Sequence, residues 1–169
     1  RMIEAMLTVE HGKQIAPGFV VDRRSFKWAT VTTLVTLMSW TGQRKSEALL
    51  PDGEPWDMSR ASKSQISWKH DEGTVLVSPT EQQLRDMDDK WCMRWTPGCS
   101  KQDYSGTHWA PRPMVMRYHP TDVMNAPRKM VEMELRFLIQ GTEREKTPLF
   151  LLTPSKKNPM EFRHVEKLL

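Results

Sequence analysis

The sequence has 169 residues, of which 38% are hydrophobic and 27% charged, a size and balance that fit one folded domain and exclude a chain disordered by composition. Its 25 basic and 21 acidic residues leave a net charge of +4, a mild excess that fits a polyanion partner and ordinary solubility equally well. Two cysteines indicate a reducing compartment without a disulfide framework, and the longest uncharged run, residues 29–43, is shorter than the roughly 20 residues that span a bilayer.

In chain order, residues 1–24 are expected to form a lead-in with one short helix, which Gly12 and Pro17 end. Apolar residues at positions 31, 34, 35 and 38 then recur with helical spacing, which predicts a helix over residues 26–40 with a wide buried face. A charged stretch follows this helix, and residues 51–64 are expected to form a loop.

The middle of the chain predicts a small antiparallel sheet. Residues 65–68 and 74–77 form two short strands of a hairpin, and Thr80 is the candidate N-cap of a short helix over residues 81–87. Residues 89–113 contain glycines and prolines and are expected to be irregular, before another strand over residues 114–118.

The last part is expected to be mostly helical. A second clear helix lies within residues 121–141, regular from Ala126 because of Pro127, with Gly141 just beyond its end. A strand-like run at 149–152 and a helix opening at Pro159 follow. The predicted fold class is therefore mainly α with a small antiparallel β-sheet (α+β), in a single partial domain with its core at residues 25–169.

The most informative stretch is Thr41-Gly42-Gln43-Arg44-Lys45-Ser46-Glu47-Ala48-Leu49-Leu50. It resembles the first conserved box of tyrosine recombinases (phage integrases), which runs Thr-Gly-x-Arg-x-Ser-Glu and follows an apolar helix. The alternative reading is a helix terminus with a solvated charge cluster, where cations are favourable in any case.

A second stretch extends the resemblance. Residues 96–106 include Ser100-Lys101-Gln102-Asp103, which resembles the segment that carries the catalytic lysine in a divergent branch of eukaryotic mobile elements (Crypton-like recombinases). Asn125-Ala126-Pro127-Arg128 and Thr147-Pro148-Leu149-Phe150 resemble further motifs of that branch, so the resemblance covers most of the chain from about Phe26.

The resemblance implies specific roles. Arg44 would stabilise the transition state, because its planar fork binds a phosphate in two places and keeps its charge. Glu47 would orient Arg44, Lys45 would add a DNA contact, and Lys101 would act as the general acid for the leaving 5′ oxygen. A solvated loop lysine is the alternative for Lys101, with Lys63 and Lys69 as fallback candidates.

The resemblance also implies what the complete protein does. We expect breakage and rejoining of double-stranded DNA through a 3′-phosphotyrosyl link, as a homotetramer, without a metal, small-molecule cofactor or membrane. Localisation would be nuclear for a eukaryotic mobile element and cytoplasmic otherwise. The rival is a non-catalytic DNA-binding or interaction domain from a decayed mobile element.

Several family features are not found in the sequence. We expect the chain to be a fragment without the His-x-x-Arg box and the nucleophilic tyrosine, and hence inactive by itself. Tyr104 and Tyr118 are interpreted as structural or DNA-proximal, and Arg163-His164 as an incidental likeness to the second box.

Two other constellations carry less weight. Cys92, Cys99, His108 and His119 could form a zinc set, but their spacings lack the tight pairs of structural zinc sites. Trp91, Trp95 and Trp109 could stack on nucleotides, although filling space over the small sheet is the commoner role.

Overall fold

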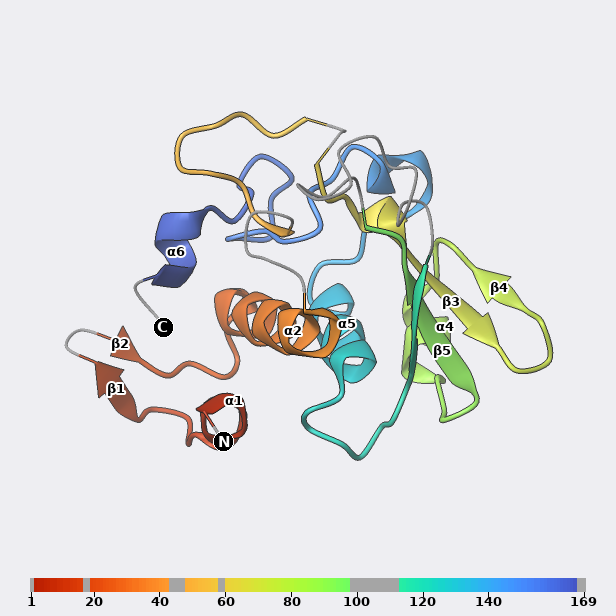
Figure 1. The fold of residues 1–169 in the computed structure, drawn as a ribbon, viewed down its shortest axis with the longest axis horizontal. Helices are drawn as coiled ribbons and strands as arrows, with labels where there is room; N and C mark the ends of the chain where they lie inside the picture. The colour runs from red at the N-terminus through yellow and green to blue at the C-terminus, as the bar shows by residue number, and fades with distance from the viewer. Residues whose placement is uncertain (1, 17–18, 43–47, 58–59, 98–112, 167–169) are drawn as a thin grey trace.

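The computed structural model describes residues 2–16, 19–42, 48–57, 60–97 and 113–166. Within these ranges the fold is mixed α+β, with five α-helices and a four-stranded antiparallel sheet. Figure 1 shows the sheet on one side of the molecule, α2 and α5 in the centre, and α1 with the β1–β2 hairpin on the opposite side. Arg44, Lys45, Glu47 and Lys101 lie outside the described residues.

The first half contains the longest helix. The helix α1 (Met2–Thr8) and the hairpin of β1 (Gln14–Ala16) and β2 (Phe19–Val20) precede α2 (Phe26–Thr41). The predicted helices of this region are confirmed. Residues 28–37 of α2 are all buried, so this helix is enclosed on every side and is not a surface helix with one apolar stripe.

The main sheet has the strand order β4-β3-β5-β6, with every pair antiparallel. Its strands are β3 (Ile66–His70), β4 (Val75–Leu76), β5 (Trp91–Trp95) and β6 (Met114–Arg117), and a short 3-10 helix, η1 (Lys63–Gln65), leads into β3. The predicted hairpin is therefore confirmed, as is the strand near residue 114.

The strand β5 corrects the expectation that residues 89–113 are irregular. It is a central strand, paired with both β3 and β6. Met93 and Trp95 face the core with no exposed surface, whereas the alternate residues Cys92 and Arg94 are partly exposed. This period-two pattern is that of a half-buried strand, and the neighbouring glycines and prolines concealed it.

The helices α4 and α5 both begin where the sequence predicts. The helix α4 (Glu81–Arg85) begins as predicted, with a capping box in which the Thr80 hydroxyl accepts from the Gln83 N–H and the Gln83 amide accepts from the Thr80 N–H. The helix α5 (Ala126–Glu134) begins at its predicted place, after the N-cap Asn125.

The end of α5 corrects the predicted span of 121–141. The α-helix stops at Glu134, and Gly141, with φ of 61°, opens the 3-10 helix η2 (Gly141–Arg144) instead of ending the α-helix. The strand expected at residues 149–152 is reduced to isolated bridges, Ser62 with Pro148 and Leu151 with Pro159. The helix α6 (Phe162–Glu166) begins three residues later than the expected start at Pro159.

One core joins the sheet to α2 and α5. Its largest fully buried side chains include Trp68, Trp95, Leu34, Met130 and Met133. Met130 and Met133 place the buried side of α5 in this core, and Trp95 fills space over the sheet, which is the commoner role expected for the tryptophans.

Candidate functional site

The helix α2 leads directly into the arginine box, and its amino end is fixed by a cap. The Ser25 hydroxyl accepts a hydrogen bond from the Trp28 N–H at 3.1 Å. Four buried threonines satisfy their hydroxyls by donating to carbonyls one turn back in the same helix. These residues are Thr30, Thr32, Thr33 and Thr36.

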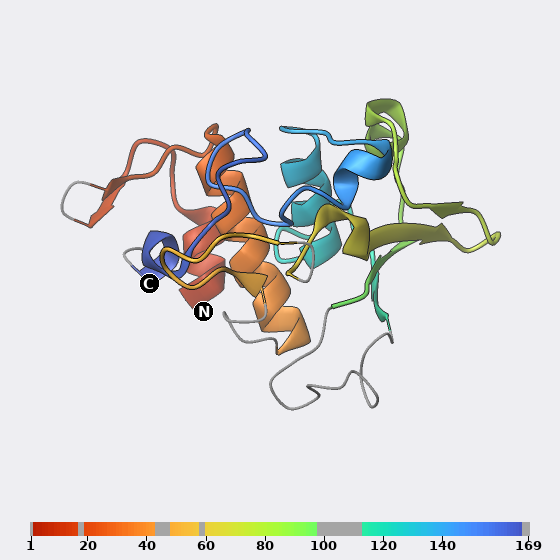
Figure 2. The ribbon, with the colours of Figure 1, turned by 90° about the horizontal axis from the view of Figure 1, so that it is seen from above.

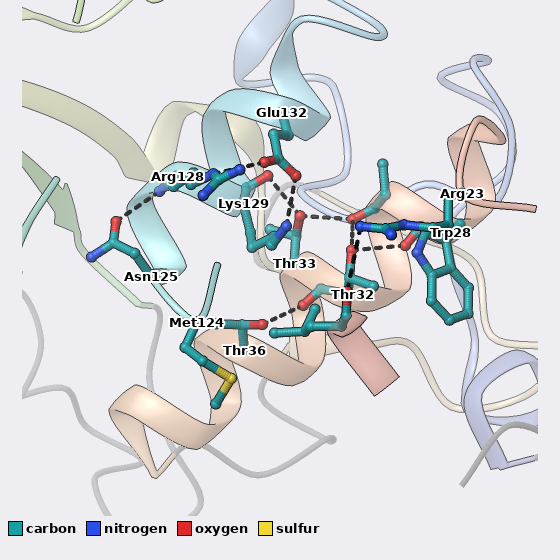
Figure 3. A network of polar contacts seen from close by, with 12 residues as sticks. Arg23, Trp28, Thr32, Thr33, Thr36, Met124, Asn125, Arg128, Lys129 and Glu132 are labelled. Atoms are coloured by element: carbon teal, nitrogen blue, oxygen red, sulfur yellow. Dashed lines mark hydrogen bonds and ion pairs between the residues drawn. The ribbon is translucent and has the colours of Figure 1, made fainter. Parts of the chain in front are cut away.

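The helices α2 and α5 are locked together by polar contacts, which Figure 3 shows. The Thr33 hydroxyl also reaches the Lys129 carbonyl of α5 at 2.8 Å. At the end of α2, the indole N–H of Trp40 donates to the Met124 carbonyl at 2.9 Å, just before α5. These two contacts therefore fix α2 against α5 in the middle of the helix and near its carboxyl end.

Gly42 ends α2 in the left-handed conformation, with φ of 68° and ψ of 11°, and its N–H donates to the Met38 carbonyl at 2.8 Å. Glycine adopts this conformation without steric cost, so the chain can turn tightly where the box begins. Residues 43–47 lie outside the described residues.

The chain on the other side of the box is also anchored. Ala48, Leu49 and Leu50 are buried, and the Leu50 carbonyl accepts from the Phe162 N–H at 3.0 Å. Leu50 also forms a parallel bridge with Glu161. Both flanks of Arg44, Lys45 and Glu47 are thus held by the packed body of the protein.

Lys101 belongs to the connection between two neighbouring strands. The last register pair of β5 and β6 is Trp95 with Met114, so residues 96–113, which include Lys101, connect these strand ends in the sequence. Figure 2 shows the carboxyl end of α2 on the same side of the molecule as these two strand ends. The convergence of Arg44 and Lys101 stays a prediction, because both residues lie outside the described ranges.

Of the two fallback lysines, Lys63 is not available for catalysis. Its side chain is 2% exposed, and its Nζ is 2.8 Å from Oε1 of Glu134. Lys69 is exposed on β3, and its amine forms no ion pair with a described residue. Of these two lysines, Lys69 is therefore the one that is exposed and unpaired among the described residues.

Glu134 is the centre of a buried ionic cluster that the sequence interpretation missed. Arg144 places its Nη1 2.9 Å from Oε2 of Glu134 and donates through Nη2 to the Lys63 carbonyl at 2.8 Å. Burial raises the pKa of the Glu134 carboxyl, but the attraction of Lys63 and Arg144 and their hydrogen bonds outweigh it and leave this pKa below its ordinary value. A glutamate at a core-facing position of α5 was the signal for such a cluster.

The remaining candidates that the structure describes all contact neighbouring groups of the protein. Tyr118 is 8% exposed and packs edge-on against Trp68, and burial raises the pKa of its phenol, so it is not poised as a nucleophile. Arg163 is paired with Glu161 at 3.0 Å, and the Nδ1 of His164 accepts from the Glu161 N–H. Tyr104 lies outside the described residues.

The described ranges contain neither a metal-ligand cluster nor a membrane-spanning helix. No group of three or more His, Cys, Asp or Glu residues there could hold a metal ion, and Cys99 and His108 fall outside these ranges. No helix in the same ranges is long and apolar enough to cross a membrane.

No protein-family model, curated protein or solved structure matches this chain.

Proposed function

We propose that this chain belongs to a DNA breaking-and-rejoining enzyme of the tyrosine recombinase type. The observation that carries the proposal is the box Thr41-Gly42-x-Arg44-x-Ser46-Glu47, attached to the left-handed end of a helix that is buried and fixed. Further support comes from Lys101, on the connection of two neighbouring strands whose ends lie on the same side of the molecule as that helix end.

The proposed reaction needs a fixed cation and a proton donor. A tyrosine oxygen attacks a DNA phosphorus and forms a 3′-phosphotyrosyl link, while the bond to the 5′ oxygen breaks. Lys101 gives its proton to that oxygen, and the fork of Arg44 stabilises the charge that develops on the non-bridging oxygens. A 5′ hydroxyl of a second strand then reverses the step, so the phosphodiester is remade without an external energy source.

In the proposal, this chain supplies the arginine and lysine of the active site but not the nucleophilic tyrosine. Glu47 orients Arg44, Lys45 contacts the DNA backbone, and the nucleophile is neither of the two tyrosines of this sequence. The 169-residue chain is therefore expected to bind duplex DNA without cutting it, and the complete enzyme to act as a homotetramer on paired sites of a mobile element.

The test is a covalent trap with the protein encoded by the full reading frame. It is incubated with random-sequence duplexes that carry a nick, so that the short released strand diffuses away and the protein remains attached to the 3′ end. We expect Arg44→Ala to slow formation of this adduct by about 10²–10³-fold, and the exposed-site control Lys157→Ala to leave it unchanged.

A second substrate isolates the role of Lys101. Replacing the 5′ bridging oxygen by sulfur removes the need for a proton, because a thiolate leaves without protonation. Lys101→Ala should slow cleavage of the oxygen substrate by about 10²–10⁴-fold and the sulfur substrate far less. DNA binding without any adduct would overturn the enzyme proposal and favour the decayed-element rival.

A further inference from the structure

The two faces of the four-stranded sheet differ sharply in composition. Directly paired residues of an antiparallel sheet lie on the same face. One face is the core face already described. We call the other the outer face, and it consists of Ser67, Lys69, Val75, Cys92, Arg94, Val115 and Arg117.

The outer face carries cations on three neighbouring strands and no acidic strand residue. The register places Lys69, Cys92 and Arg117 in one row and Ser67, Arg94 and Val115 in the next. Diagonal neighbours in adjacent rows are within roughly 7–8 Å of each other, so the three cations form one positively charged patch.

Two of these cations are unpaired among the described residues. Arg117 binds Asp71 through Nη1 at 2.8 Å and 2.9 Å, whereas Lys69 and Arg94 form no ion pair in the described part of the chain. The acidic residues Asp71 and Glu72 lie beyond the row of Lys69, at the β3–β4 turn. The positive charge is therefore least compensated toward Arg94, next to the strand end that leads to residue 98.

We propose that the outer face binds the phosphate backbone of duplex DNA, with Lys69 and Arg94 as the contacting cations. Flexible cations on a solvated sheet neutralise phosphates and release counterions, and they need no base-specific geometry. The choice of duplex DNA as the partner rests on the proposed function, whereas the location of the surface rests on the register and the unpaired cations.

Charge reversal tests the surface in the 169-residue chain. Affinity for a random-sequence duplex is measured over a series of salt concentrations for Lys69→Glu/Arg94→Glu and for the control Lys13→Glu/Lys157→Glu. The control lysines are exposed and lie outside the sheet. We expect the first pair to reduce the slope of log affinity against log salt by about 2, roughly one per lost phosphate contact, and the control pair to leave it near the wild-type slope.

A footprint at Cys92 keeps the inference testable if the reversed variants do not fold. Cys92 is a partly exposed free thiol between Lys69 and Arg117, and Cys99→Ser leaves it as the single cysteine of the sequence. Bound duplex should slow alkylation of Cys92 several-fold. An unchanged alkylation rate at saturating DNA would overturn the inference.

The outcomes separate this inference from the proposed function. Loss of the covalent adduct on Arg44→Ala together with unchanged binding of the reversed variants would refute the surface and keep the enzyme. Protection of Cys92 without any adduct in the full-length protein would keep the surface and refute the enzyme. Protection by an acidic protein and not by DNA would also refute the inference.

Discussion

At the scale of single residues, the buried cluster of Lys63, Glu134 and Arg144 decides how the regions around it pack. It joins η1 to α5 and η2, which follow much later in the sequence, and each side chain is at most 2% exposed. Arg144 adds a bond to the Ile139 carbonyl at 3.0 Å, which holds the chain between α5 and η2. Buried ions are costly unless their partners are present, so this cluster is sensitive to the loss of its one carboxylate.

Glu134→Gln should destabilise the protein strongly, because it leaves two buried cations without a counter-charge. The expected loss is about 3–5 kcal/mol in the free energy of unfolding, measured by urea denaturation. Glu132→Gln is the matched control on the same helix. Glu132 also contacts two cations, Arg128 at 3.0 Å and Lys129 at 2.8 Å, but it is 38% exposed and should cost about 0–1 kcal/mol. Equal losses for the two variants would contradict this account of the cluster.

The same carboxyl predicts a pH dependence. The pKa of Glu134 is lower in the folded than in the unfolded state, so its stabilising contribution is present above the ordinary glutamate pKa and is lost as the pH falls toward the folded value. Unfolding curves from pH 7 downward should show a steep loss for the wild type. In Glu134→Gln the loss of stability that comes from protonation of Glu134 should be missing. If the variant and the wild type lose stability equally as the pH falls, Glu134 does not cause the acid sensitivity.

Gly42 links a single backbone conformation to the proposed site. A side chain at φ of 68° is strained, although no described residue beyond the adjoining backbone has an atom within 4 Å of the place a Cβ would take. Gly42→Ala should therefore cost about 1 kcal/mol in the free energy of unfolding, and Gly42→Asn less, because asparagine tolerates this region. If alanine costs nothing, the helix does not need the left-handed end seen here.

At the scale of elements, the sequence predicted helices better than the central strand. The helical spacing within residues 26–40 and the N-cap candidate Thr80 are local signals, and local signals can be recognised without the rest of the fold. The strand β5 is stabilised by its neighbours on both sides, and such pairing is not visible within its own five residues. The Glu134 cluster is non-local for the same reason.

The candidate site shows the same division. The Gly42 turn follows from its residue type and its place after an apolar helix, and the structure confirms it. Whether Arg44 and Lys101 meet depends on how two segments that are 57 residues apart in the sequence (101 − 44) pack together. That juxtaposition is a tertiary property, so it stays a prediction from the motifs.

The contact between α2 and α5 gives a prediction at this scale. Thr33 and Thr36 are both fully buried on α2, and both donate to a carbonyl of their own helix, but only Thr33 also reaches α5. Thr33→Val should therefore lower the free energy of unfolding by about 1 kcal/mol more than Thr36→Val, measured by thermal or urea unfolding. Equal effects would show that the bond to the Lys129 carbonyl does not hold the two helices in register.

At the scale of the whole molecule, the carboxyl end of α2 lies on the same side of the fold as the ends of β5 and β6 at Trp95 and Met114 (Figure 2). The outer face of the sheet points away from α2 and α5, because these helices pack against the core face. In the proposal, the duplex contacts this outer face from Lys69 to Arg94, the outer-face cation nearest those strand ends. Because the contacts are mostly with phosphates, binding should weaken steeply as salt increases.

The most direct test of the central claim is a cross-link between positions 44 and 101. Cysteines are introduced as Arg44→Cys and Lys101→Cys in a chain with Cys92→Ser and Cys99→Ser, and a short bifunctional thiol reagent is added. The account predicts rapid intramolecular cross-linking of this pair and little for the matched pair Lys101→Cys with Lys157→Cys. Cross-linking of positions 44 and 101 no faster than that of the control pair would show that the two residues do not share a site.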